Sequence, residues 1–222
     1  EGLTVFRDQS FTMDRYSKGV KRLQDAAIIR QFQFAQDSGP MAHPIQPASY
    51  IEVNNFYTVT VYNKGAEVIR MIQTILGERA FKQGLNDYFA QYDGQAVSCD
   101  DFVSTMASSS GVNLDQFKLW YTQAGTPKVT VTQHTQGDQV VLDMTQAIPP
   151  TPGQTDKKPM VLPIRLAFLD AKGQRVAVTH EGQVATEQLC LLTKDQQRFA
   201  FEGVPKDAVL SLLRDFSAPI HL

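Results

Sequence analysis

The spacing of apolar residues changes near residue 125, and this change constrains the fold more than any other feature of the sequence. Before it, apolar side chains recur every three or four residues, which is the period of one helix face. After it, they alternate with polar side chains, as in strands with one buried face. The turn Gly125-Thr126-Pro127 separates the two patterns. The sequence therefore predicts an α+β chain, with an all-helical subdomain over residues 1–124 and a small antiparallel β-sandwich over residues 125–222.

The helical half is expected to contain one long first helix over residues 13–35. Its apolar stripe consists of Tyr16, Val20, Leu23, Ala27, Ile28 and Phe32. A second helix begins near Tyr62 and ends before Gly77, which suits a C-terminal cap. Three further helices are predicted over 78–92, over 99–108 and after Asn113.

The second half predicts about seven short strands, the number that suits a small sandwich. The alternation is clearest over 129–132, 140–144 and 162–168. Further strands are expected over 175–179, 187–193, 197–201 and 208–216. Prolines and a glycine between 149 and 158 predict a loop.

Composition excludes several classes of partner. A formal net charge of −2 gives no field that would attract nucleic acid or an anionic membrane. No apolar run approaches the ~20 residues that a membrane helix needs. The two cysteines, Cys99 and Cys190, lie in different predicted domains, so reduced thiols and a cytoplasmic location are expected. Since the chain starts at Glu1 without methionine, it is expected to begin inside a longer protein.

The common catalytic motifs are missing from the sequence. There is no HExxH, CxxC, GxSxG or phosphate-binding glycine loop, and the four histidines show no ligand spacing. Cys99 precedes two aspartates, whose charge would raise a thiol pKa. Polar and phenolic side chains do gather over 54–58 and 62–66. From pattern alone, Tyr62 is better explained as an amphipathic residue at a helix start, and Gly65 as a close helix contact.

The run from Asn54 to Met71 contains Tyr62 in the motif Tyr-Asn-Lys-Gly-Ala. It resembles the catalytic-tyrosine segment of the bacterial aminopeptidase N family. The members of this family are zinc metallopeptidases of the gluzincin clan. The segments 1–9, 40–45 and 120–127 resemble the same family. The resemblance spans the helical half, and the predicted sandwich corresponds to the β domain that follows it in the family. It implies a fold like the C-terminal lobe of thermolysin, followed by that β domain.

The resemblance also implies a site. Glu1, which heads Glu-Gly-Leu-Thr, would be a zinc ligand that also helps to bind the substrate's α-amine, and Tyr62 would be the catalytic hydrogen-bond donor. The two zinc histidines, the glutamate base and the Gly-Ala-Met-Glu-Asn loop of the family would lie upstream, outside this chain. The large C-terminal helical domain would lie outside it too. The implied substrates are peptides with a free N-terminus, the implied cofactor is zinc, and the chain alone would be inactive. Asn63 departs from the acidic residue often found there, which could alter substrate preference.

Three functions stay open from the sequence. The first is a broad-specificity zinc aminopeptidase that accepts alanine and basic residues. The second is a non-catalytic scaffold in which the sandwich is a binding module. The third is hydrolysis of lipid epoxides, as in one relative of the family. An HExxH motif within the ~20 residues before Glu1 would favour an enzyme over a scaffold.

Overall fold

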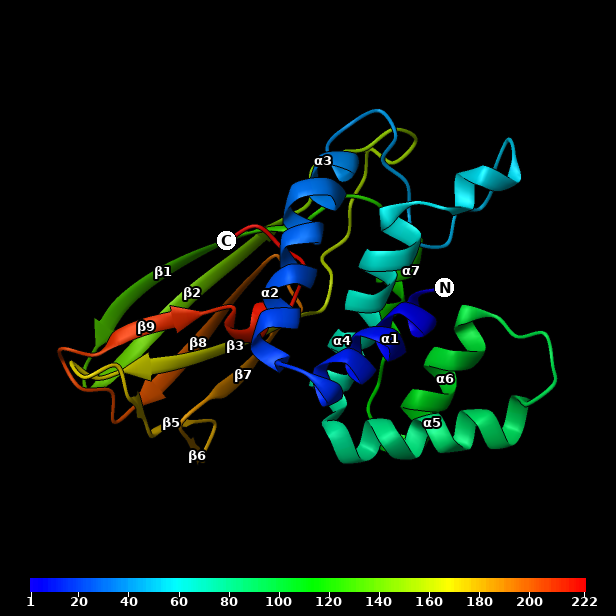
Figure 1. Ribbon diagram of the computed structural model, residues 1–222. Helices are drawn as coiled ribbons and strands as arrows, with labels where there is room; N and C mark the ends of the chain where they lie inside the picture. Colours follow the sequence, from blue (N-terminus) through cyan, green and yellow to red (C-terminus); the bar gives the residue numbers. More distant parts are fainter. The chain divides into compact units, whose positions relative to one another are not determined.

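The chain forms two compact units, one helical and one of β-strands (Figure 1). A computed structural model describes all residues from 1 to 222. The helical unit consists of Glu1–Gly125 and Pro150–Lys157, and the β unit of Thr126–Pro149 and Lys158–Leu222. The predicted α+β class is confirmed. None of the helices has the length and apolar character to cross a membrane.

The helical unit combines α-helices with two π-helical turns. The α-helices are α1 (Gly2–Arg15), α2 (Lys18–Ile28), α3 (Phe34–Asp37), α4 (Gly65–Leu76), α5 (Glu78–Tyr92), α6 (Cys99–Ser110) and α7 (Leu119–Thr122). The π-turns are η1 (Ile29–Gln33) and η3 (Thr60–Lys64), and the 3₁₀ turns are η2 (Val53–Phe56) and η4 (Gln116–Lys118). The sequence period did not reveal the π-turns.

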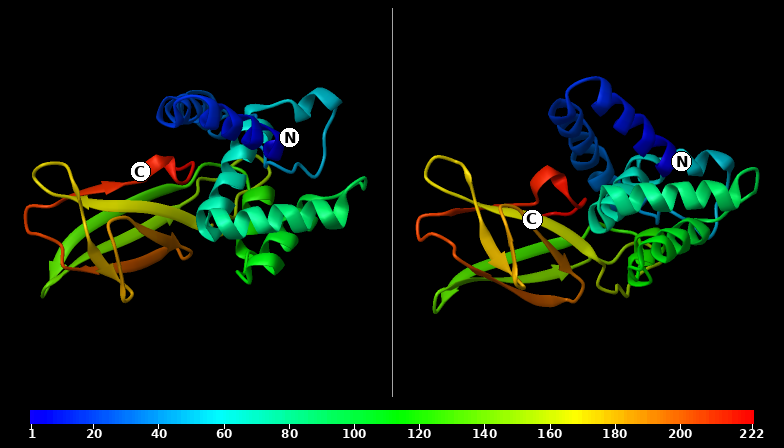
Figure 2. Two further views of the ribbon diagram at one scale, coloured as in Figure 1. Left: turned by 60° about the horizontal axis from the view of Figure 1, so that its bottom comes forward. Right: turned by 90° about the horizontal axis from the view of Figure 1, so that it is seen from below.

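The core of this unit surrounds α4, whose residues Ala66, Val68 and Ile72 are fully buried. On α1, Phe6 meets Phe81 of α5 edge to face, with 5.6 Å between the ring centroids. Gly84 lets α5 approach α6, because a Cβ there would lie 2.6 Å from the sulfur of Met106. These two helices lie side by side in both views of Figure 2.

The prediction of one helix over 13–35 with a buried apolar stripe is wrong. The chain breaks at Tyr16, Ser17 caps the start of α2, and η1 interrupts the helix again. Tyr16 is 79% exposed and Leu23 is 74% exposed, whereas Arg22 is buried. The reason is a pair of hydrogen bonds of 2.6 and 2.5 Å from the Arg22 guanidinium to the buried carboxylate of Glu67 on α4. The face of α2 that turns inward is therefore the one that carries the ion pair with Glu67.

The β unit contains two sheets. Its strands are β1 (Lys128–Gln136), β2 (Gln139–Ala147), β3 (Leu162–Leu169), β4 (Arg175–Val176), β5 (Val178–His180), β6 (Gln183–Ala185), β7 (Gln188–Leu192), β8 (Gln196–Glu202) and β9 (Val209–Leu212). One sheet has the order β1-β2-β8-β5-β6; the other has β4-β3-β7, with β9 also paired to β3, and all these pairs are antiparallel. Phe168 of β3 meets Phe201 of β8 edge to face at 5.4 Å, which joins the two sheets through their apolar faces.

The segment over 150–157 is hydrogen-bonded to the residues that follow α7 and to its last residue, Thr122. Gln154 donates to the carbonyl of Thr122 and accepts from the amide of Ala124, both at 2.8 Å. The Lys157 amine donates to the carbonyl of Ala124 at 3.0 Å. The sequence predicted a loop here, and side-chain hydrogen bonds give that loop a defined place in the helical unit.

Candidate functional site

Two glycines bring the start of α1 against the start of α4. A Cβ on Gly2 would lie 2.6 Å from the carbonyl carbon of Gly65, and a Cβ on Gly65 would lie 3.2 Å from the Cα of Gly2. Only residues without side chains allow two backbones to come this close. The contact joins segments more than sixty residues apart in the sequence. Glu1 directly precedes Gly2, and Tyr62 lies three residues before Gly65.

Glu1 and Tyr62 interact directly. The half-buried phenol of Tyr62 lies close enough to the exposed residue Glu1 for its carboxylate to raise the pKa of the phenol. Desolvation raises the pKa of Tyr62 above its ordinary value, and the negative charge of Glu1 raises it further. Tyr57 stacks on the ring, with 6.1 Å between the centroids. At neutral pH Tyr62 is therefore a protonated donor held beside a carboxylate.

Glu1 also lines a cavity of about 260 Å³ within the helical unit. Most of the wall is apolar, with Leu3, Ile45, Ile69 and Phe102 among its residues. Tyr62 does not line this cavity, so Glu1 is the residue that the cavity and the phenol share.

His43 holds the loop that leads into η3. Its Nδ1 lies 2.8 Å from the carbonyl oxygen of Pro44, which can only accept, so Nδ1 donates. Its Nε2 is then free to accept from the Thr58 hydroxyl at 3.0 Å. Thr58 in turn accepts from the amide of Val61 at 3.2 Å. These bonds make His43 an anchor of the loop.

The remaining candidate ligands and nucleophiles form no further centre. No three His, Cys, Asp or Glu side chains are grouped so as to hold a metal ion. Burial raises the pKa of the Cys99 thiol, and Asp100 adds to the effect. Burial raises the pKa of Cys190 to about 12. Both thiols are free of disulfide bonds and are poor nucleophiles.

Sequence reasoning missed a group of buried polar residues next to Tyr62. Lys64 and Asp37 form an ion pair of 2.6 Å, and each side chain is only 1% exposed. Gln33 and Thr60 are fully buried and hydrogen-bonded to each other at 3.2 Å. Residue type argues against burial of such side chains, so only the fold could reveal them.

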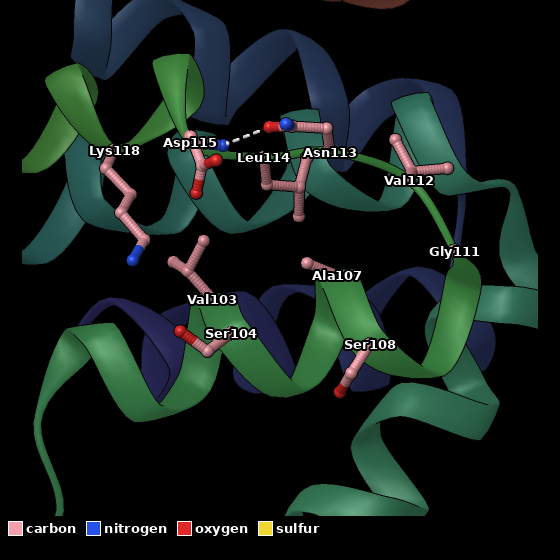
Figure 3. A pocket seen from close by; sticks show the side chains of 10 residues that line it. All are labelled: Val103, Ser104, Ala107, Ser108, Gly111, Val112, Asn113, Leu114, Asp115 and Lys118. Atoms are coloured by element: carbon pink, nitrogen blue, oxygen red, sulfur yellow. Dashed lines mark hydrogen bonds between the residues drawn. The ribbon is translucent and has the colours of Figure 1, made fainter.

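A larger hollow of about 460 Å³ lies between α6 and the segment over 111–118 (Figure 3). Val103, Ala107 and Leu114 form its apolar part. Around it stand Ser104, Ser108 and Asn113, whose side-chain oxygen accepts from the Asp115 amide at 2.8 Å. No carboxylate and phenol meet there, so it lacks the chemistry found at Glu1 and Tyr62.

Comparisons with known proteins agree with the two units. The peptidase family M1 domain matches residues 1–121, and a domain of unknown function with an Ig-like fold matches residues 125–222. The chain is 46% identical over 224 residues to aminopeptidase N of Escherichia coli and 44% identical over 228 residues to aminopeptidase N of Haemophilus influenzae. Both matches cover 100% of this chain and 26% of the relative, so the chain spans about a quarter of their length.

A solved structure is similar over the whole chain. The crystal structure of Legionella pneumophila aminopeptidase A in complex with aspartic acid has a TM-score of 0.76 and 28% sequence identity. The match covers 100% of this chain and 23% of that one. The resemblance to the aminopeptidase N family that the motifs indicate is confirmed by these matches.

Proposed function

This chain belongs to peptidase family M1, and on that premise we propose that it is part of a zinc-dependent aminopeptidase, to which it supplies a zinc ligand, Glu1, and a catalytic hydrogen-bond donor, Tyr62. The observation that carries the proposal is the close approach of Gly2 to Gly65, which brings the segments of Glu1 and Tyr62 together. The substrates would be peptides with a free N-terminus.

This chain can provide one of the protein ligands of a zinc site. Glu1 has an exposed carboxylate at the edge of an apolar cavity, and carboxylate oxygens are common zinc ligands. Catalytic zinc sites use three protein ligands, whereas this chain groups no three such side chains. The other two would come from the longer protein, and we expect the chain by itself to be inactive. Bound zinc supplies a Lewis acid for the scissile carbonyl and activates a water molecule.

Tyr62 would stabilise the oxyanion that develops on the scissile carbonyl. Such a donor must be protonated and already in place before the reaction. The raised pKa of Tyr62 keeps its proton at neutral pH, and the stacking of Tyr57 limits the motion of its ring. Glu1 would also attract the positively charged α-amine of the substrate through its exposed carboxylate.

We place no catalytic residue in the β unit and propose that it is a spacer within the longer protein. The two free cysteines favour a cytoplasmic location. Asn63, beside Tyr62, is a candidate determinant of a broad preference for N-terminal residues. The main alternative is a non-catalytic scaffold, which would be favoured if the longer protein lacked HExxH.

The replacement of Tyr62 by phenylalanine tests the proposal in the longer protein that contains this chain. Tyr62→Phe should lower kcat by about 10²- to 10³-fold, the magnitude for loss of one oxyanion donor, with zinc content unchanged. Tyr16→Phe is a matched control, because Tyr16 is 79% exposed and follows the end of α1 opposite to Glu1. Turnover of an alanyl anilide and metal analysis measure the two quantities. Near-normal turnover by Tyr62→Phe would contradict the assignment.

A further inference from the structure

Tyr62 lies at the middle of the five-residue π-turn η3, which continues directly into α4. A π-turn is rare, and it often marks a functional site. Neighbouring residues of an α-helix are about 100° apart around its axis. Without the extra residue of the π-turn, the side chains before and after it would be rotated relative to each other by roughly that angle. The turn therefore sets the direction of Tyr62 relative to Gly65 and α4.

The first residue of this turn is held by two glutamines. The Thr60 hydroxyl accepts from the Gln33 side-chain amide at 3.2 Å and donates to the Gln36 oxygen at 2.6 Å. The same Gln36 oxygen accepts from the Thr60 backbone amide at 3.3 Å. Thr60 and Gln33 are fully buried, so water does not compete for these bonds.

The last residue of the turn is held by an ion pair. The Lys64 amine lies 2.6 Å from Asp37 Oδ2 and donates to the Gly125 carbonyl at 3.0 Å. It also lies 5.9 Å from the centroid of the Trp120 ring. The cost of desolvation makes such a pair a weak source of stability, and a fixed geometry is the better reason for its presence.

Both ends of η3 are thus fixed by one stretch of helix. Gln33 ends η1, and Gln36 and Asp37 belong to α3. None of these residues lines the cavity next to Glu1. Their contacts therefore reach the site through the turn, which carries Tyr62 at its middle and is followed by Gly65.

We propose that the η3 anchor, defined as Gln33, Gln36, Asp37, Thr60 and Lys64, positions the phenol of Tyr62 beside Glu1. The inference rests on the proposed catalytic function of Tyr62. The five residues are positioning residues and do not contact the substrate. The loss of one anchor at Thr60 is expected to shift the phenol relative to Glu1.

Thr60→Val tests the anchor in the longer protein, because it replaces the buried hydroxyl by a methyl group of similar size. We expect kcat to fall about 10- to 100-fold, since displacement of a catalytic group by 1 Å costs on that order. KM should change less than about 2-fold if ground-state binding is retained, and zinc content should stay the same. Thr60→Ser keeps the hydroxyl and should retain most of the activity. Thr105→Val is the matched control, because Thr105 is also buried and its hydroxyl donates within α6 to the Asp101 carbonyl.

The pairing of Thr60→Val with Tyr62→Phe separates this inference from the proposed function. If Thr60 acts through the phenol, Thr60→Val should cost almost nothing further when Tyr62 is already phenylalanine. Additive losses would overturn the positioning role, as would normal turnover by Thr60→Val beside a defective Tyr62→Phe. Normal turnover by Tyr62→Phe would instead refute the proposed function. A crystal structure of Thr60→Val should show the Tyr62 ring displaced, and an unmoved ring would overturn the inference independently of activity.

Discussion

At the scale of single residues, the site depends on the absence of side chains at Gly2 and Gly65. A Cβ on Gly2 would fall 2.6 Å from a backbone carbon, a distance that forces α1 and α4 apart. Glu1 precedes one of these glycines and Tyr62 lies three residues before the other. A small separation of the backbones would therefore separate the carboxylate from the phenol.

Gly2→Ala should destabilise the protein by about 1–3 kcal/mol, the usual cost of overpacking. Gly19→Ala is the control: it lies in α2, and nothing stands within 4 Å of its added Cβ. It should be neutral or stabilise the protein by about 0.5–1 kcal/mol, because alanine is the better helix former. Urea-induced unfolding measures both. Equal effects of the two substitutions would show that the close contact does not hold the site together.

From the sequence alone, Glu1 and Tyr62 could be predicted as site residues only through the resemblance to the aminopeptidase N family. The spacing of residues near Tyr62 favoured a structural explanation, since an amphipathic tyrosine at a helix start is common. Its partner Glu1 is 61 positions away, and no local pattern reports a contact of that separation. The buried Lys64 and Asp37 were missed for the same reason, because each becomes acceptable inside only when the fold supplies the other.

At the scale of elements, the apolar period predicts helix interiors better than helix ends and interruptions. The apolar period correctly predicted helices near α4, α5 and α6. The apolar stripe is buried on α4 and α6, whereas Phe89 on α5 is 45% exposed. The period was wrong at α2, because the buried hydrogen bonds from Arg22 to Glu67 outweigh the apolar stripe in choosing the inward face. The π-turns were not predicted, because one extra residue hardly alters the spacing of apolar residues over a short segment.

The start of α6 gives a test that depends on pH. Ser98 and Asp101 form a capping box, in which the Ser98 hydroxyl accepts from the Asp101 amide while the Asp101 carboxylate accepts from the Ser98 amide. The hydrogen bond from the Ser98 backbone is the main cause that lowers the pKa of Asp101, followed by the one from its hydroxyl. A carboxyl with a lowered folded-state pKa adds stability above its unfolded pKa, and this is lost as pH falls through the folded value.

Ser98→Ala should therefore destabilise the protein by about 1 kcal/mol at neutral pH, as for other lost N-caps. The penalty should shrink as the pH drops below about 4, where Asp101 becomes protonated in the unfolded chain and then in the folded one. Ser104→Ala is a suitable control, since Ser104 lies exposed within the same helix and caps nothing. Thermal unfolding between pH 3 and pH 7 measures the effect. A penalty that does not vary with pH would show that the hydrogen bond from the Ser98 hydroxyl to the Asp101 carboxylate adds no stability.

At the scale of the whole molecule, the chain corresponds to one part of its longer relatives. It spans about a quarter of the aminopeptidases N that it matches, at 26% of their length. Its two units have separate cores, one around α4 and one between two sheets. The residues with site chemistry lie in the helical unit, which matches the M1 peptidase domain. The α+β architecture was predictable because two different apolar periods divide the sequence at one turn.

We propose that Glu1 binds zinc and that Tyr62 lies next to the metal as a hydrogen-bond donor. Diffraction from crystals of the longer protein, recorded on both sides of the zinc absorption edge, tests it most directly. The account predicts an anomalous peak about 2.0–2.2 Å from a Glu1 carboxylate oxygen, the usual zinc–carboxylate distance. The Tyr62 phenol should lie where it can donate a hydrogen bond to an oxygen bound at that position. A zinc peak remote from Glu1, or a Tyr62 phenol turned away from it, would contradict the account.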